Sequence, residues 1–268
     1  MKKGILIVLT VILLCVLAFS VWKMVDIWLD YRAGEQFYVK MNDYVSIPET
    51  EPTKPPKADQ AEEQEETIPE EAPKPVWPQV DFAALQAINS DVVGWIYIPD
   101  TNVNYPILQG KNNDQYIYHL MTGEYNSAGS IFLEAGIARD FSAKNSVIYG
   151  HNMKNGTMFA GITGYKSQEF YDAHPTAMLL TPEGNYYVHI FSGYVTDIWG
   201  DAWDSGFSED SFRKWLANRE RKSYFTSDVI PTQQDRILTF STCTYETNDA
   251  RFVVHGVLEA YVEENTAE

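Results

Sequence analysis

One cysteine in the C-terminal part of the chain has the setting of a candidate nucleophile. The chain has only 2 cysteines, Cys15 and Cys243, and Cys15 lies in an apolar run near the N-terminus, so Cys243 has no disulfide partner in its own domain. Cys243 follows the strand-like run 236–240 and is surrounded by polar residues. A thiol attacks as the thiolate, so this role requires a base or a cation nearby. A buried cysteine acting as a small hydrophobe is the alternative interpretation.

His151 is the best placed of the 5 histidines to act as that base. Gly150-His151-Asn152 directly follows the strand-like run 146–149, and a loop residue at a strand end can face a cleft held by a rigid sheet. The other histidines have ordinary structural settings in strand-like, helical or proline-flanked segments, and they are His119, His174, His189 and His255.

Arg251 is a candidate for stabilising negative charge on a reacting carbonyl oxygen. Acyl transfer needs a donor at the position where that charge develops. Arg251 begins the last strand-like run, 251–262, and a hairpin after Cys243 would return it beside the thiol. A surface arginine paired with Asp249 is equally consistent with the spacing.

Sequence signatures of other chemistries are missing. The chain has no Gly-x-Ser-x-Gly elbow, no His-Glu-x-x-His, no Cys-x-x-Cys and no glycine-rich phosphate loop. We therefore expect no metal site and no cofactor.

Three segments, in order along the chain, resemble the motifs of sortases. Residues 239–243 (TFSTC) resemble the Thr-Leu-x-Thr-Cys signature, with Phe240 at the usual leucine; residues 251–254 (RFVV) resemble the arginine strand; and residues 149–153 (YGHNM) resemble the histidine loop. Four further segments resemble the class B branch in particular, namely GWI (94–96), NYP (104–106), QGKNN (109–113) and GSIF (129–132). The resemblance covers roughly residues 85 to 262.

This resemblance implies a reaction and a role for each candidate residue. Cys243 would attack the carbonyl of a threonine in a C-terminal sorting motif, form a thioacyl enzyme and pass the acyl group to an amine. His151 would exchange protons with the thiol and the leaving amine, and Arg251 would hold the carbonyl oxygen. Positions that contact substrate in the family correspond to Asn113, Ile117 and Ser241.

The elements that must position these residues belong to one mainly β domain. Apolar and polar residues mix throughout 81–262, with a short helix expected at 81–88 and roughly seven β-rich runs after it, which predicts a sandwich or barrel. A capped helix is expected after Ser208, within the long connection 196–234. The resemblance implies an eight-stranded sortase-type barrel with helices at the N-terminus and one helix between strands 6 and 7.

The N-terminal part predicts a membrane anchor and a spacer. Residues 4–22 carry no charge and would span about 28 Å as a helix, close to the thickness of a bilayer core. A cleaved signal peptide is the alternative, although its apolar region is usually shorter. Residues 46–80 hold 8 of the 13 prolines and many glutamates, as expected of a disordered linker that keeps the domain at a distance from the membrane. The predicted organisation is 1–3 cytoplasmic N-terminus, 4–22 transmembrane anchor, 23–45 juxtamembrane segment, 46–80 linker, 81–262 catalytic domain and 263–268 tail.

Charge and resemblance together suggest the partners. A net charge of -17 gives no electrostatic footprint for nucleic acid. The resemblance implies a single-pass protein of a Gram-positive cell membrane, with a cytoplasmic N-terminus and an extracellular catalytic domain. Its partners would be a surface protein bearing a sorting motif and the amine of a cell-wall precursor. Three alternatives stay open, namely a pilin-polymerising enzyme with a lysine acceptor, a cysteine endopeptidase that transfers to water, and a wall-linked adhesin in which Cys243 is structural.

Overall fold

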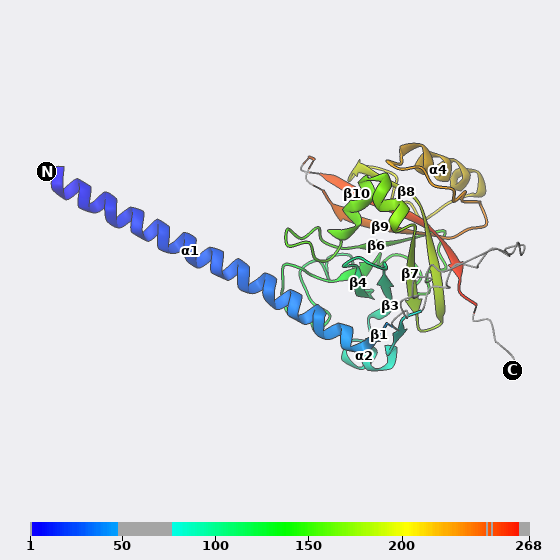
Figure 1. The fold of residues 1–268 in the computed structure, drawn as a ribbon, viewed down its shortest axis with the longest axis horizontal. Coiled ribbons are helices and arrows are strands. Elements are labelled where there is room, and N and C mark those ends of the chain that lie inside the picture. Colours follow the sequence, from blue (N-terminus) through cyan, green and yellow to red (C-terminus); the bar gives the residue numbers. More distant parts are fainter. Residues whose placement is uncertain (1, 48–76, 245, 248, 263–268) are drawn as a thin grey trace, which may run out of the picture.

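Eight strands form a closed barrel in the computed structural model, which describes residues 2–47, 77–244, 246–247 and 249–262 (Figure 1). The eight-stranded barrel is therefore confirmed. Its hydrogen-bonded order is β10-β8-β7-β3-β4-β5-β6-β9, closed by pairing of β9 with β10. The strands are β3 (Val92–Tyr97), β4 (Asn104–Leu108), β5 (Ile131–Leu133), β6 (Asn145–Tyr149), β7 (Thr176–Thr181), β8 (Gly184–Asp197), β9 (Ile237–Cys243) and β10 (Ala250–Ala260).

The sequence pattern located seven of these strands and missed β4 as a strand. Pro106 lies inside β4, and a proline within a short run argues against an interior strand because it cannot donate to the ladder. In the barrel, β4 pairs antiparallel with β3, with Pro106 opposite Trp95, and parallel with β5. Tertiary pairing therefore overrides the local signal.

One helix directly precedes the barrel, and others lie in two of its connections. Helix α2 (Phe82–Ile88) begins where expected, with the Asp81 side chain accepting from the Ala84 N–H at 2.9 Å. A 3-10 helix, η2 (Gly161–Lys166), and α3 (Gln168–Ala173) lie between β6 and β7. Helix α4 (Glu209–Lys222) lies between β8 and β9, the sixth and seventh barrel strands, so the helix expected in that loop is confirmed.

Helix α4 buries one face against the barrel. Ser208 and Ser211 form a capping box at its N-terminus. Phe212, Trp215 and Leu216 pack with residues of β8 and β9, and the fully buried Arg219 lies one turn further along the same face.

Helix α1 (Lys2–Met41) runs without a break from the N-terminus to the barrel, and Figure 1 shows it as a single rod that leaves the domain. Its N-terminal part is apolar and exposed, and in the described part of the chain it is the one helix long and apolar enough to cross a membrane. Its C-terminal part docks on the segment between β4 and β5. The Tyr38 hydroxyl donates to the Gly129 carbonyl, and the Asn126 side chain donates to the Asp30 carbonyl at 2.8 Å. Gly34 permits the close approach, because a Cβ there would lie 2.6 Å from Asn126 Oδ1.

The two ends of the proline-rich segment lie side by side. β1 (Val45–Ser46) pairs antiparallel with β2 (Gln79–Val80), and the Asp81 N–H donates to the Tyr44 carbonyl at 3.0 Å. Residues 44–46 and 79–81, on either side of this segment, are therefore in contact, and α1 reaches the barrel directly. The linker between them stays a prediction. The expected disorder falls on residues 48–76, and the expected tail on 263–268, both outside the described residues.

Removing the Tyr38 hydroxyl should weaken the docking of α1. Tyr38→Phe keeps the ring but leaves the buried Gly129 carbonyl without its donor, at a cost of about 1–3 kcal/mol. Amide hydrogen exchange of the full-length protein in detergent should then be faster over residues 30–41, with the barrel strands unchanged. Tyr224→Phe, at a half-exposed tyrosine, is the control and should change nothing. Unchanged exchange in Tyr38→Phe would contradict the docking role of this hydroxyl.

Candidate active site

A cavity of about 440 Å³ opens where β6 and β9 end. All six residues that the sequence singled out line it, so the structure brings together Cys243, His151 and Arg251 with Ser241, Asn113 and Ile117. The remaining lining residues are Asp114, Tyr118, Ser130, Phe132, Tyr149, Gly150 and Thr242.

Strand pairing places Arg251 directly opposite Cys243. β9 and β10 are antiparallel, with Cys243 and Arg251 as register partners. Side chains of directly opposed residues project from the same face of a sheet, with Cβ atoms about 4.5–5.5 Å apart. The guanidinium also donates to the carbonyl of Ala250 at 3.0 Å, which keeps it near the hairpin. The arginine thus lies beside the thiol, as the hairpin interpretation expects.

Three hydrogen bonds attach the histidine loop to β9. The Gly150 N–H donates to the Ser241 carbonyl at 3.1 Å, and the Thr242 hydroxyl donates to the Gly150 carbonyl at 2.7 Å. On the other side of His151, the Asn152 amide donates to the Cys243 carbonyl at 3.0 Å. His151 is therefore held between two residues that are bonded to the nucleophile's strand.

The ring of His151 has a defined tautomer. Its Nε2 lies 2.7 Å from the Ile117 carbonyl, which can only accept, so Nε2 carries the proton and Nδ1 keeps the lone pair. Tyr118 stacks on the ring, with centroids 5.4 Å apart. Burial lowers the pKa of His151 below its usual value, and the bond to Ile117 partly opposes that shift. A neutral imidazole at pH 7 is the form that can accept a proton.

Asn113 is held by groups that sequence reasoning missed. Its amide oxygen accepts from the Ala135 N–H at 2.8 Å, and its amide nitrogen donates to Glu134. The other Glu134 oxygen accepts from the Tyr149 hydroxyl at 2.6 Å. Burial and this carboxylate raise the pKa of Tyr149, which therefore stays a neutral donor. Tyr149 belongs to the histidine-loop motif, which could have identified it, whereas no local signal marks Glu134.

Ser241 also has an unforeseen neighbour. Its Oγ accepts from the indole N–H of Trp203 at 3.1 Å, and the two residues are far apart in the sequence.

The described residues contain no cluster of three or more His, Cys, Asp or Glu side chains that could hold a metal ion.

Comparison with known proteins identifies similar chains. A family model described as the sortase domain matches residues 96–259. Sortase B of Listeria monocytogenes is 41% identical over 177 residues, which cover 65% of this chain and 72% of that protein. The Staphylococcus aureus sortase B-substrate complex has a TM-score of 0.65 at 34% identity, covering 68% of this chain and 85% of that one. A crystal structure of sortase B complexed with triglycine has a TM-score of 0.64 at 34% identity, covering 68% of this chain and 86% of that one.

The titration of His151 should show the effect of its burial. In the ¹⁵N NMR spectrum, assigned with His151→Gln, its midpoint should lie below the usual value of about 6.5, with Nε2 protonated in the neutral form. Since the folded-state pKa is the lower one, the stability contribution is present above about pH 6.5 and is lost as the pH falls through the folded-state pKa. Activity that needs the neutral ring should fall over the same acidic range.

Tyr118→Ala tests the cause of this shift. Loss of the stacked ring exposes His151 to water, so both the NMR midpoint and the acidic limb of the activity profile should move to higher pH. A midpoint at or above 6.5 in the unsubstituted protein would show that burial does not control this histidine.

Proposed function

This chain belongs to the sortase family, as a cysteine transpeptidase of the class B branch, and on that premise we propose that it is a membrane-anchored enzyme that joins surface proteins to the cell wall. It would cleave a C-terminal sorting motif after threonine and transfer the protein to an amine of a peptidoglycan precursor. The observation that carries the proposal is that Cys243, His151 and Arg251 line the same cavity.

In the first half-reaction, the sulfur of Cys243 attacks the threonine carbonyl and its proton passes to His151. Negative charge develops on the carbonyl oxygen, and the Arg251 guanidinium, on the neighbouring strand, donates hydrogen bonds to it. His151 then protonates the leaving amine as the C–N bond breaks. The products are a thioester and the released C-terminal fragment.

In the second half-reaction, an acceptor amine attacks the thioester carbonyl. His151, neutral again, takes a proton from the attacking amine and returns it to sulfur as the C–S bond breaks. A new amide bond forms and the Cys243 thiol is regenerated.

The two substrates have support from different observations. Asn113, Ile117 and Ser241 line the cavity and are proposed to contact the sorting motif. Sortase B has been solved with a substrate and, separately, with triglycine. A glycine peptide has a primary amine at its N-terminus, and a primary amine is the chemical class expected of the acceptor.

The membrane assignment is supported by α1. With its apolar part in the bilayer and the N-terminus in the cytoplasm, the barrel would lie outside the cell. Trp22 ends the uncharged run, and Asp30 already contacts the barrel, so about 12 Å of helix would separate them. The cavity would then work close to the bilayer surface, where a lipid-linked precursor is found.

Replacing the nucleophile should abolish all turnover. Cys243→Ala should retain the fold by circular dichroism but form neither thioacyl enzyme nor product from a sorting peptide, because the covalent step has lost its sulfur. Persistent turnover in a folded Cys243→Ala protein would refute the proposed function.

Arg251 should contribute mainly to the transition state. Arg251→Ala should lower kcat by about 100- to 1,000-fold, as for loss of an oxyanion donor, and Arg251→Lys should recover only part of this because it lacks the planar fork. Steady-state kinetics with a sorting peptide measure both. An Arg251→Ala enzyme with unchanged kcat would exclude this role.

The identity of the acceptor can be read from the products. A sorting peptide incubated with a cell-wall amine, with a purified pilin or with neither should give the amide of the cell-wall amine in the first mixture. Preferential accumulation of the pilin conjugate would favour the lysine acceptor instead. Release of free acid despite abundant amine would favour an endopeptidase.

A further inference from the structure

Ser241 presents a hydroxyl group of defined orientation to the cavity. The Trp203 indole N–H occupies one lone pair of Ser241 Oγ at 3.1 Å. Within the described part of the chain, the hydroxyl hydrogen of Ser241 has no protein acceptor, and Ser241 lines the cavity. The hydroxyl is therefore set to donate to an acceptor on whatever occupies the cavity, such as a main-chain carbonyl of a peptide.

Trp203 belongs to the loop between β8 and α4, and the barrel holds that loop from one side. The buried Asn145 donates through Nδ2 to the carbonyl of Ala202 at 3.1 Å and to that of Asp204 at 2.9 Å. These two bonds bracket Trp203. The indole ring packs with Ala202 and with residues of β8 and β10.

A directional chain of hydrogen bonds orients Asn145. Its Oδ1 accepts from the Thr239 hydroxyl at 2.6 Å, so the Thr239 oxygen must accept from His255 Nδ1, 2.8 Å away. His255 Nε2 then accepts from the Tyr194 hydroxyl at 3.3 Å. The amide of Asn145 is thereby fixed with its nitrogen toward the loop.

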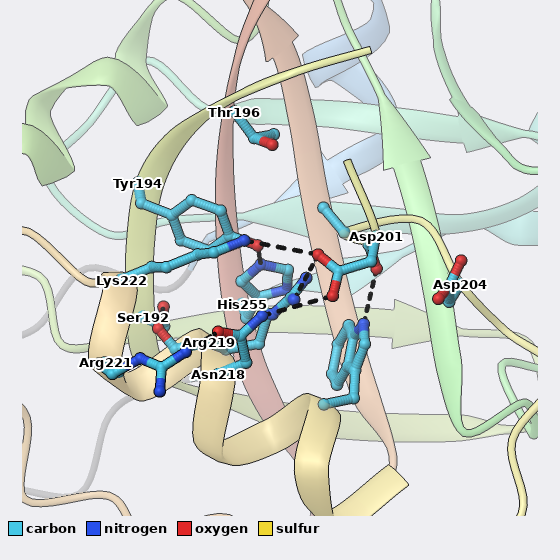
Figure 2. Close-up of polar contacts among 12 residues, drawn as sticks. Ser192, Tyr194, Thr196, Asp201, Asp204, Asn218, Arg219, Arg221, Lys222 and His255 are labelled. Carbon is cyan, nitrogen blue, oxygen red and sulfur yellow. Dashed lines mark hydrogen bonds and ion pairs between the residues drawn. The ribbon is translucent and has the colours of Figure 1, made fainter. Parts of the chain in front are cut away.

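Helix α4 holds the same loop from the other side, through Asp201 (Figure 2). The Asp201 carboxylate lies 2.5 Å from Arg219 and 3.5 Å from Lys222, and its carbonyl accepts from the Trp215 indole at 2.7 Å. Figure 2 shows Arg219 and Lys222 converging on this one carboxylate. Asp201 is two residues before Trp203, so the position of the loop depends on this contact.

Asp201 is the counter-charge of a fully buried arginine, Arg219. In the described part of the chain, Asp201 is its one carboxylate partner, and the rings of Trp215 and Tyr194 flank the guanidinium at 4.8 and 5.6 Å. A buried guanidinium without a counter-charge is costly, and Asp201 supplies that counter-charge. The pair therefore favours the loop position in which Trp203 reaches Ser241.

We propose that Trp203 is a positioning residue for substrate recognition, which orients the Ser241 hydroxyl toward a main-chain carbonyl of the bound sorting peptide. The Asp201–Arg219 pair holds Trp203 in place from outside the cavity. The inference rests on the proposed function, since it assigns a donor for the same substrate. Neither Trp203 nor Asp201 touches the reacting atoms.

Trp203→Phe tests the proposal, because it keeps an aromatic ring and removes only the N–H donor. KM for a sorting peptide should rise by about 3- to 10-fold with kcat nearly unchanged, as for the loss of one neutral hydrogen bond. The rate at which a small thiol reagent alkylates Cys243 should stay the same. In a Ser241→Ala background, Trp203→Phe should have no further effect on KM, because the group it orients is gone.

The loop contact is tested by variants that neutralise one or both charges of the Asp201–Arg219 pair, measured with the full-length enzyme. Asp201→Asn leaves Arg219 unpaired, so hydrogen exchange over 198–207 should become faster and KM should rise as in Trp203→Phe. Asp201→Asn combined with Arg219→Met removes both charges and should recover at least part of both effects. Asp210→Asn is the matched control, because its pair with Arg213 lies on the exposed face of α4.

These outcomes separate this inference from the proposed function. Turnover by the unsubstituted enzyme and its loss in Cys243→Ala establish the reaction without reference to Trp203. In that active enzyme, a Trp203→Phe KM within twofold of the original would overturn the inference. An undiminished effect of Trp203→Phe in the Ser241→Ala background would overturn it as well.

Discussion

The pairing of β9 with its two neighbours sets the positions of Cys243, Arg251 and the loop that carries His151. On one side β10 places Arg251 opposite Cys243, and on the other side β6 ends at Tyr149, opposite Ser241, so that the histidine loop begins beside the nucleophile's strand. Side chains alternate between the two faces of a strand, so a slip of one residue would turn Cys243 away from the cavity. The chemistry therefore depends first on a main-chain register.

Buried polar groups around β9 make that register specific. Thr239 and Asn145 lie on adjacent strands and bond each other, and both are connected to His255 on β10. An alternative register would leave these groups without partners in the interior, at a cost that an apolar core would not impose. Burial, and to a lesser degree Arg219, lowers the pKa of His255, so this histidine remains a neutral member of the network. The outer helix α4 joins the network through the loop that contains Asp201.

Side-chain hydrogen bonds connect the barrel domain to α1. Tyr38 on α1 bonds to Gly129, and the next residue, Ser130, lines the cavity. The pairing of β1 with β2 places residues 45–46 beside 79–80. The position of the cavity relative to α1 is therefore determined by packed side chains.

Sequence alone identified the class of fold and the candidates for nucleophile, base and oxyanion donor, Cys243, His151 and Arg251, because short motifs and strand periodicity carry these signals. It also located α2 and α4, whose caps are local signals. Tertiary structure decided the partners of those groups, namely the Ile117 carbonyl on His151, Trp203 on Ser241 and Asp201 on Arg219. It also decided that the C-terminal part of α1 docks on the barrel domain, which composition did not indicate. Each of these contacts joins residues that are not neighbours in the sequence, and no local pattern of residues encodes such a contact.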